Sequence, residues 1–294
     1  MQFLKRIFLF ALVNVLILMT LSVVFNIVSV FFGIQLADQS GLWIFYGIIG
    51  MGGALINLAI SRKMAKWTMG VRVIDPNTHD TRERALVNSV HELARRAQLP
   101  AMPEVGIYES PEVNAFATGP SKSRSLVAVS TGLLERMDKD AVEGVLGHEI
   151  AHIANGDMVT MTLLQGVINT MVLIAARLIA SAIAGNSDDR RGFREMMVFY
   201  ALQFVLSLFG SMVVGYFSRR REFRADAGGA RFAGRERMLG GLKSLRSVYG
   251  QVDDSHQSLA TLKISGHPGR SIMMLMATHP PLEDRIRRLE TMPL

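Results

Sequence analysis

Residues 147–152 read Gly147-His148-Glu149-Ile150-Ala151-His152, within a run of helical periodicity from Asp140 to Asn155. Histidines four residues apart lie on one face of a helix, so both imidazoles can bind one metal ion. Glu149 projects roughly 100° away around the helix axis, where its carboxylate can act as a general base without being a ligand. Because zinc acidifies water and a carboxylate can take the proton, this spacing indicates metal-assisted peptide hydrolysis.

The composition is that of a membrane protein, with 49% hydrophobic residues, 18 methionines and a mean hydropathy of +0.26. The net charge is +7 and the pI is close to 10.0, a balance that also occurs in nucleic-acid-binding proteins. No nucleic-acid motif is present, so we expect no nucleic-acid partner and assign the charge to residues flanking membrane spans. The absence of cysteine excludes disulfides and cysteine-ligated zinc.

Two uncharged runs, Ile7 to Gly33 and Gly41 to Ile60, are each long enough to cross a bilayer and predict a transmembrane hairpin. The loop between them holds Asp38 and no Lys or Arg. Basic residues flank the outer ends of the pair: Lys5, Arg6, Arg62, Lys63, Lys66 and Arg72. The positive-inside rule therefore predicts that both ends face the cytoplasm. Glycines in the second run would let it pack closely on a neighbour: Gly47, Gly50, Gly52 and Gly53.

A second apolar pair, Met158 to Ala184 and Met196 to Phe217, contains a single charge, Arg177. An arginine inside a bilayer is costly unless it snorkels toward the surface. The connection between the runs, Gly185 to Glu195, also carries three arginines, which the positive-inside rule disfavours outside the cell. Two interpretations follow: a hairpin that spans the bilayer, and a hairpin buried in the protein or lying at the interface.

From about Pro76 the sequence becomes that of a soluble α+β domain. We predict an amphipathic helix, two strands and two C-terminal helices: Arg82 to Ala97, Glu104 to Glu109, Ser125 to Ser130, Gly234 to Tyr249 and Leu282 to Glu290. Asp140 with Glu143 resembles a capping box for the motif helix, and Asn155-Gly156 is typical of a helix end. Residues 114–119 form either an edge strand or an ordinary loop, and residues 253–269 are loop-like.

A catalytic zinc site needs a third protein ligand on the same side of the membrane as His148. An even number of crossings satisfies this condition for residues just after Phe217. Glu222 and Asp226 lie there, four apart on one helical face. Glu222 can ligate the metal while Asp226 accepts the N–H of a ligand histidine and fixes its tautomer. The alternative is a basic juxtamembrane helix with two solvated acids.

Four stretches together resemble the HtpX-like membrane zinc endopeptidases, a family that also contains the CAAX prenyl proteases. They read HEIAHIANGD at 148–157, NAFATG at 114–119, RREFRADA at 220–227 and THPP at 278–281. The resemblance covers essentially the whole chain, with one departure at Arg224, where histidine is expected in many relatives. It implies an integral membrane protein, mainly α, with about four transmembrane helices and a cytoplasmic α+β zinc protease domain of gluzincin type that contains a small sheet.

The resemblance also implies roles for individual residues. His148, His152 and Glu222 would bind one Zn²⁺ per chain, with Glu149 as general base and acid and Asp226 orienting a ligand histidine. His279 and Arg285 resemble residues placed beside the zinc, where they can stabilise an oxyanion. The strand Asn114, Ala115, Phe116, Ala117 and Thr118 would pair with an extended substrate backbone.

Together these features predict four segments: a transmembrane hairpin at 1–66, the first catalytic part at 67–157, a second apolar hairpin at 158–217 and the second catalytic part at 218–294. The expected function is a zinc metalloendopeptidase of the inner or plasma membrane, with its N-terminus and catalytic domain in the cytoplasm. Its expected substrates are membrane or misfolded proteins, in quality control and stress response.

Two alternatives remain. A membrane scaffold or adaptor could carry a structural metal site, but such a site needs no base and favours four protein ligands. A prenyl-protein peptidase would be expected to enclose its site in more membrane helices.

Overall fold

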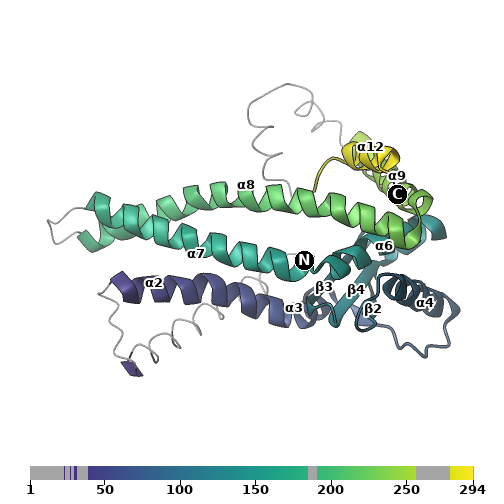
Figure 1. Ribbon diagram of the computed structural model, residues 1–294, viewed down its shortest axis with the longest axis horizontal. Coiled ribbons are helices and arrows are strands. Elements are labelled where there is room, and N and C mark those ends of the chain that lie inside the picture. The colour runs from purple at the N-terminus through teal and green to yellow at the C-terminus, as the bar shows by residue number, and fades with distance from the viewer. Residues whose placement is uncertain are drawn as a thin grey trace. The chain divides into compact units, whose positions relative to one another are not determined.

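The computed structural model describes residues 39–184, 191–255 and 279–293, together with four isolated helical positions, Val23, Ile27, Val30 and Phe31. Apart from those four positions, the predicted first span, Ile7 to Gly33, lies outside the described residues. So does most of the loop-like segment, from residue 256 onward. The chain is mostly helical with one small sheet, as predicted (Figure 1).

Two compact units make up the chain. One contains residues 1–58 and 160–215, and the other residues 59–159 and 216–294. Within the described residues, three helices are long and apolar enough to cross a membrane: Gly41–Met69, Asp157–Ile183 and Phe193–Ala233.

The first unit contains helix α2 (Gln39–Gly47), the short π-helix η1 (Ile48–Gly52) and the start of α3 (Gly53–Met69). They pack against α7 (Asp157–Ala184). A Cβ at Gly50 would lie 2.2 Å from Thr170 Oγ1, so this glycine allows the close contact expected for the run. A Cβ at Gly47 or Gly53 would meet nothing within 4 Å in the described part of the chain.

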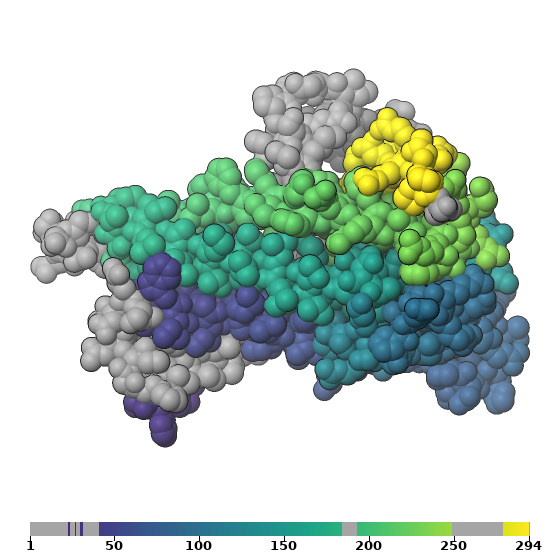
Figure 2. Space-filling view, viewed as in Figure 1, coloured from purple at the N-terminus to yellow at the C-terminus, as the bar shows by residue number. Residues whose placement is uncertain are grey.

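The second apolar pair forms α7 and α8 (Arg191–Ala233). Only 17% and 6% of their most apolar windows are buried, which excludes burial within the described part of the chain as the reason for their hydrophobicity. Large apolar side chains of α8 are instead exposed, among them Phe193, Tyr200, Phe204 and Phe209. The middle of this helix is the green segment in Figure 2.

Arg177 has a partner in this pair of helices. Its Nη1 atom lies 2.7 Å from Oε1 of Glu195. We expected Glu195 in the connection, but α8 begins at Arg191, so that Glu195 belongs to the helix and faces α7. A charge paired in this way costs less within a membrane than an isolated one.

The sheet of the second unit has the strand order β1-β2-β4-β3. Strands β2 (Glu104–Tyr108) and β4 (Arg124–Ser130) are parallel, and β1 (Arg72–Val73) and β3 (Ala115–Ser121) flank them in antiparallel orientation. The interpretation of residues 114–119 as an edge strand is confirmed, with the strand starting at Ala115. The sequence did not reveal β1, because two residues are too few to show a strand pattern.

Helices α4 (Thr81–Arg96) and α6 (Lys139–Asn155) pack against the sheet around one hydrophobic core. The N-cap of α6 is Asp138, whose carboxylate accepts a hydrogen bond from the Ala141 amide at 2.8 Å. The capping box that we expected at Asp140 is therefore wrong, because Asp140 already lies inside the first turn. The helix ends at Gly156, which adopts a left-handed φ of 72°, as the Asn155-Gly156 pair predicted.

Three further helices of the second unit lie within the described residues. The short α5 (Thr131–Arg136), which the sequence did not reveal, follows β4 directly. Helix α9 (Arg235–Ser255) packs against α6, and α12 (Leu282–Thr291) packs against α9. Because α9 continues to Ser255, the first residues of the segment expected to be loop-like are helical.

Candidate metal centre

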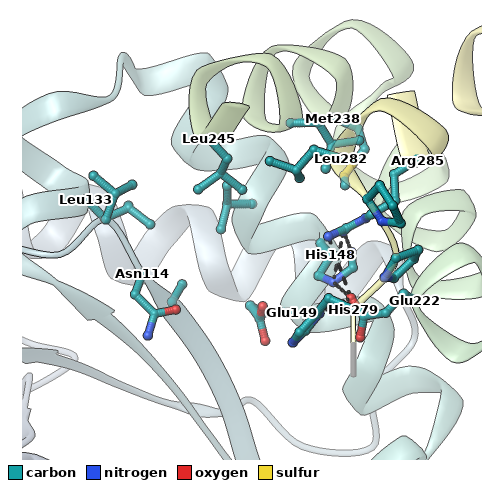
Figure 3. Close-up of a pocket in the computed structure, with 16 residues that line it drawn as sticks. Asn114, Leu133, His148, Glu149, Glu222, Met238, Leu245, His279, Leu282 and Arg285 are labelled. Atoms are coloured by element: carbon teal, nitrogen blue, oxygen red, sulfur yellow. Dashed lines mark hydrogen bonds and ion pairs between the residues drawn. The ribbon is translucent and has the colours of Figure 1, made fainter. Parts of the chain in front are cut away.

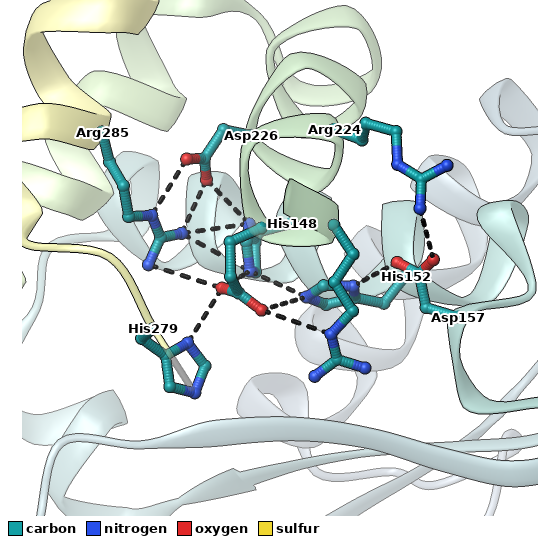
Figure 4. Close-up of polar contacts among 9 residues, drawn as sticks. His148, His152, Asp157, Arg224, Asp226, His279 and Arg285 are labelled. Carbon is teal, nitrogen blue, oxygen red and sulfur yellow. Dashed lines mark hydrogen bonds and ion pairs between the residues drawn. The ribbon is translucent and has the colours of Figure 1, made fainter. Parts of the chain in front are cut away.

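Two helices bring three ligand residues together. His148 and His152 come from α6, and Glu222 comes from α8 (Figure 4). The two histidine Nε2 atoms are 3.1 Å apart, and each lies 3.3 Å from an oxygen of the Glu222 carboxylate. All three residues are buried. The structure thus brings together the predicted ligand set.

The dimensions of this cluster fit a tetrahedral metal ion. Metal–ligand bonds of about 2.0–2.1 Å place neighbouring ligand atoms about 3.3 Å apart. Glu222 is 0% exposed, and neither of its carboxylate oxygens has a hydrogen bond of standard geometry among the described residues. Arg221 Nε and Arg285 Nη1 each lie 3.7 Å from this carboxylate, at the edge of ion-pair distance, and a metal ion bound between the ligands would stabilise its buried charge directly. The donor set of two imidazoles and one carboxylate suits a divalent metal such as zinc.

Each histidine has an outer carboxylate partner. His148 Nδ1 lies 2.9 Å from Asp226 Oδ1, and His152 Nδ1 lies 2.7 Å from Asp157 Oδ2. The structure therefore places Asp226, which we predicted to orient a ligand histidine, beside His148. We did not identify Asp157 from the sequence. The available signal was an acidic residue directly after the glycine that ends the motif helix.

These carboxylates set the protonation of the metal-free histidines. Burial lowers the pKa of His148, but its contacts with Asp226 and Glu222 outweigh burial and raise the pKa above the ordinary histidine value. Burial likewise opposes protonation of His152, yet Asp157 and Glu222 raise its pKa to about 9. Metal binding must therefore displace protons that these carboxylates stabilise.

Arg285 and His279 both lie at the cluster. Arg285, on α12, is buried and forms a two-pronged ion pair with Asp226, with Nε donating at 2.9 Å and Nη2 at 2.6 Å. Burial lowers the pKa of Arg285, but the pairing with Asp226 more than compensates and raises it. His279 Nδ1 lies 2.9 Å from Glu222 Oε2, and the His279 side chain is 63% exposed.

A cavity of about 480 Å³ adjoins the cluster (Figure 3). Glu149 points into it from α6, next to His148. Away from the ligands the lining is apolar and includes Leu133, Val145, Leu242 and Leu245. Asn114 and Ala115 also line the cavity, so one end of the predicted substrate strand borders it. Phe116 and Ala117 lie further along β3, and the Phe116 ring packs on Tyr108 with centroids 5.7 Å apart.

His91 lies away from the cluster. His91 Nε2 is 3.2 Å from the Pro103 carbonyl oxygen, which agrees with a structural role. His256 and His267 are outside the described residues. Arg224, at the position where the sequence departs from the family pattern, is 66% exposed, and its Nη2 atom lies 3.8 Å from Asp157 Oδ1.

Comparisons with known proteins identify relatives of this chain. The model of peptidase family M48 matches residues 80–293. A protease HtpX homolog of Bacillus subtilis is 50% identical over 298 residues, covering 97% of this chain and 99% of the relative. Protease HtpX of Xanthomonas oryzae pv. oryzae is 48% identical over 290 residues, with 97% of each chain covered.

Among solved structures, the crystal structure of S. mikatae Ste24p matches with a TM-score of 0.67 and 17% identity. The match covers 98% of this chain and 66% of that one, and it shows a common fold.

Proposed function

Because this chain belongs to peptidase family M48, and is a membrane metalloprotease, we propose that it is a zinc-dependent endopeptidase acting at the cytoplasmic face of the inner or plasma membrane. The observation that carries the proposal is the convergence of His148, His152 and Glu222 beside a cavity into which Glu149 points. Three protein ligands leave a coordination position open, as in catalytic rather than structural sites. This distinguishes the proposal from a scaffold with a structural metal.

In this proposal His148, His152 and Glu222 hold the zinc ion. When bound, zinc makes a water molecule acidic and polarises the substrate carbonyl. Glu149 is a neighbour of the ligands in sequence but points into the cavity, so its carboxylate is free to move protons. It removes a proton from the attacking water and then donates it to the leaving amine.

His279 and Arg285 supply positive or donor groups near the developing oxyanion. The exposed side chain of His279 makes it the more accessible of the two. The guanidinium of Arg285 is held by Asp226, so Arg285 also fixes the carboxylate that orients His148.

The substrate lies extended along β3, where its backbone pairs with the strand formed by residues 114–117. Ala115 pairs with Val129 of β4 on one side, and the other side of β3 has no neighbouring strand in the described ranges. The apolar part of the cavity accepts an apolar side chain next to the scissile bond. Such side chains abound in membrane proteins and in misfolded proteins, which supports a role in quality control and stress response.

The variant Glu149→Gln tests the proposal. It keeps the size of the side chain but removes the base, so we expect casein cleavage to be abolished in detergent while bound zinc is retained. Glu222→Gln should lose both, because it removes a charged ligand. The matched control is Glu143→Gln, on the same helix but outside the cavity, which should keep both properties. Substantial turnover by Glu149→Gln would overturn the assignment of the base.

A further inference from the structure

We propose that Asp157 is a positioning residue of the metal centre, which holds His152 in the tautomer that presents Nε2 to the metal. The inference rests on the proposed metal site. It adds a second outer carboxylate to the one expected at Asp226.

The geometry gives the two nitrogens of His152 different partners. Nε2 points to the ligand cluster, 3.1 Å from Nε2 of His148 and 3.3 Å from Glu222 Oε1, whereas Nδ1 lies 2.7 Å from Asp157 Oδ2, outside the ligand set. With a metal in the cluster, Nε2 and Glu222 would both be ligands, so the remaining imidazole proton would be held at Nδ1, which donates it to Asp157. A charged acceptor at this distance also increases the electron density available at Nε2.

The contact between Asp157 and His152 is buried and is therefore not a surface interaction. Asp157 is 2% exposed, although it is the first residue of α7. An acidic residue in the first turn of a helix is ordinarily stabilised by the helix dipole while remaining in water. Here the carboxylate is buried against the imidazole. The free-energy cost of removing its charge from water must be offset by a strong hydrogen bond, such as the one to His152.

The backbone explains how Asp157 reaches back to His152. Gly156 adopts a left-handed conformation with φ of 72°, so α6 ends and α7 begins at the next residue. This abrupt turn places a side chain that is five positions after His152 beside its ring. A longer connection would leave the orientation of the carboxylate undefined.

The guanidinium of Arg224 also approaches Asp157, but its contribution to the pair is small. Its distance of 3.8 Å from Asp157 Oδ1 and its exposure of 66% leave the interaction screened by water. Removal of Arg224 therefore separates the effect of a nearby charge from the effect of the Asp157–His152 contact.

The experiment measures metal affinity of the full-length protein in detergent, by competition with a chromophoric zinc chelator. In Asp157→Asn we expect the zinc dissociation constant to rise about 10- to 100-fold. With Co²⁺ in place of zinc, we expect the visible absorption bands to shift, because the orientation of one imidazole changes. Thermal unfolding of the metal-free protein serves as the readout of a merely structural role.

Two control variants accompany it. Arg224→Ala should leave the affinity close to that of the wild type, as should Asp140→Asn, an exposed acid of α6 whose partner is Arg237. Equal affinity and an unchanged Co²⁺ spectrum in Asp157→Asn would overturn the inference while leaving the proposed function intact. A wild-type protein that binds no metal would overturn both.

Should Asp157→Asn fail to fold, the wild type itself provides the test. Nitrogen-15 NMR of the zinc-loaded protein distinguishes the protonated imidazole nitrogen from the metal-bound one. We expect His152 to be protonated at Nδ1. Protonation at Nε2 with metal at Nδ1 would contradict the inference.

Discussion

At the scale of single residues, the side chains of the candidate metal centre are oriented by ion pairs and hydrogen bonds with one another. Arg285 pairs with Asp226, and Asp226 in turn contacts Nδ1 of His148. Removing one member would leave a buried charge without its partner, at a cost of about 3–5 kcal/mol. His279 differs from these residues because it is exposed and contacts the cluster through Glu222. It is thus the residue whose catalytic contribution can be measured with the least damage to the fold.

We predict that His279→Ala lowers kcat about 100- to 1000-fold while zinc content stays near that of the wild type. The physical reason is the loss of a donor at the developing oxyanion without loss of a ligand. Steady-state cleavage and metal analysis on the same preparation provide the measurement. The control is His79→Ala, an exposed histidine in the segment before α4. Loss of zinc along with activity would show instead that His279 keeps Glu222 in its ligating position.

The ligand histidines and the base were predictable because helical periodicity alone decides which side chains of 147–152 share a face. Glu222 required an argument from membrane topology, and its role followed from the family resemblance. Asp157 was not found in this way, because the sequence predicted a helix end at Gly156 but not the direction in which the chain leaves it, and the contact with His152 depends on that direction. The partner of Arg285 depends on tertiary packing between α12 and α8, which periodicity does not report.

At the scale of elements, the position of α6 depends on its close approach to α9. A Cβ on Gly144 would lie 2.1 Å from the carbonyl oxygen of Arg237, and one on Gly241 would lie 3.0 Å from that of Ala141. Glycine at these places lets the two backbones touch. His148 lies one turn after Gly144, so the packing of α6 against α9 determines the position of the first ligand residue.

We predict that Gly144→Ala lowers the free energy of unfolding by about 1–3 kcal/mol, because the added methyl group would clash with the backbone of α9, which cannot rotate away as a side chain can. Gly240→Ala is the matched control, since a Cβ there meets nothing within 4 Å. It should stabilise α9 by about 0.5–1 kcal/mol through the higher helix propensity of alanine. Thermal unfolding of both variants in detergent tests the pair. Equal melting temperatures would contradict the proposed importance of the close approach.

Element boundaries were less predictable than element types. The long apolar runs and the amphipathic helix before Pro100 were identified because each shows many repeats of its period. Helix α8 continues without a break from Arg191 to Ala233, across both an apolar and a highly charged segment, and composition suggested a division there. Glu195 was assigned to a connection for the same reason, because a charged residue next to an apolar run predicts a loop. In the structure its charge is stabilised within the helix by the ion pair with Arg177 on the facing helix.

At the scale of the whole molecule, the absence of cysteine makes the membrane orientation directly measurable. A single introduced cysteine is the only thiol in the protein and reports which side of the membrane it faces. Ser123, in the exposed turn between β3 and β4, marks the unit that contains the metal centre.

We predict that Ser123→Cys reacts with a membrane-impermeant maleimide only after cells are permeabilised, because the positive-inside rule predicts that the flanking basic residues place this unit on the cytoplasmic side. Ser187→Cys, between α7 and α8, should react in intact cells if the hairpin crosses the bilayer. Labelling of Ser123→Cys in intact cells would contradict the cytoplasmic site. Failure to label Ser187→Cys until permeabilisation would mean that the second hairpin does not cross.

Because α8 is continuous, the number of residues between its apolar part and Glu222 determines the direction in which the Glu222 side chain points. Each residue advances a helix by about 100°, so inserting one alanine between Phe217 and Glu222 would turn the ligand about a quarter of a circle relative to the apolar segment behind it. Seven inserted residues, close to two full turns, would nearly restore the original direction of the Glu222 side chain. An insertion that replaces no functional side chain would in this way change the direction of Glu222 relative to the apolar part of the same helix.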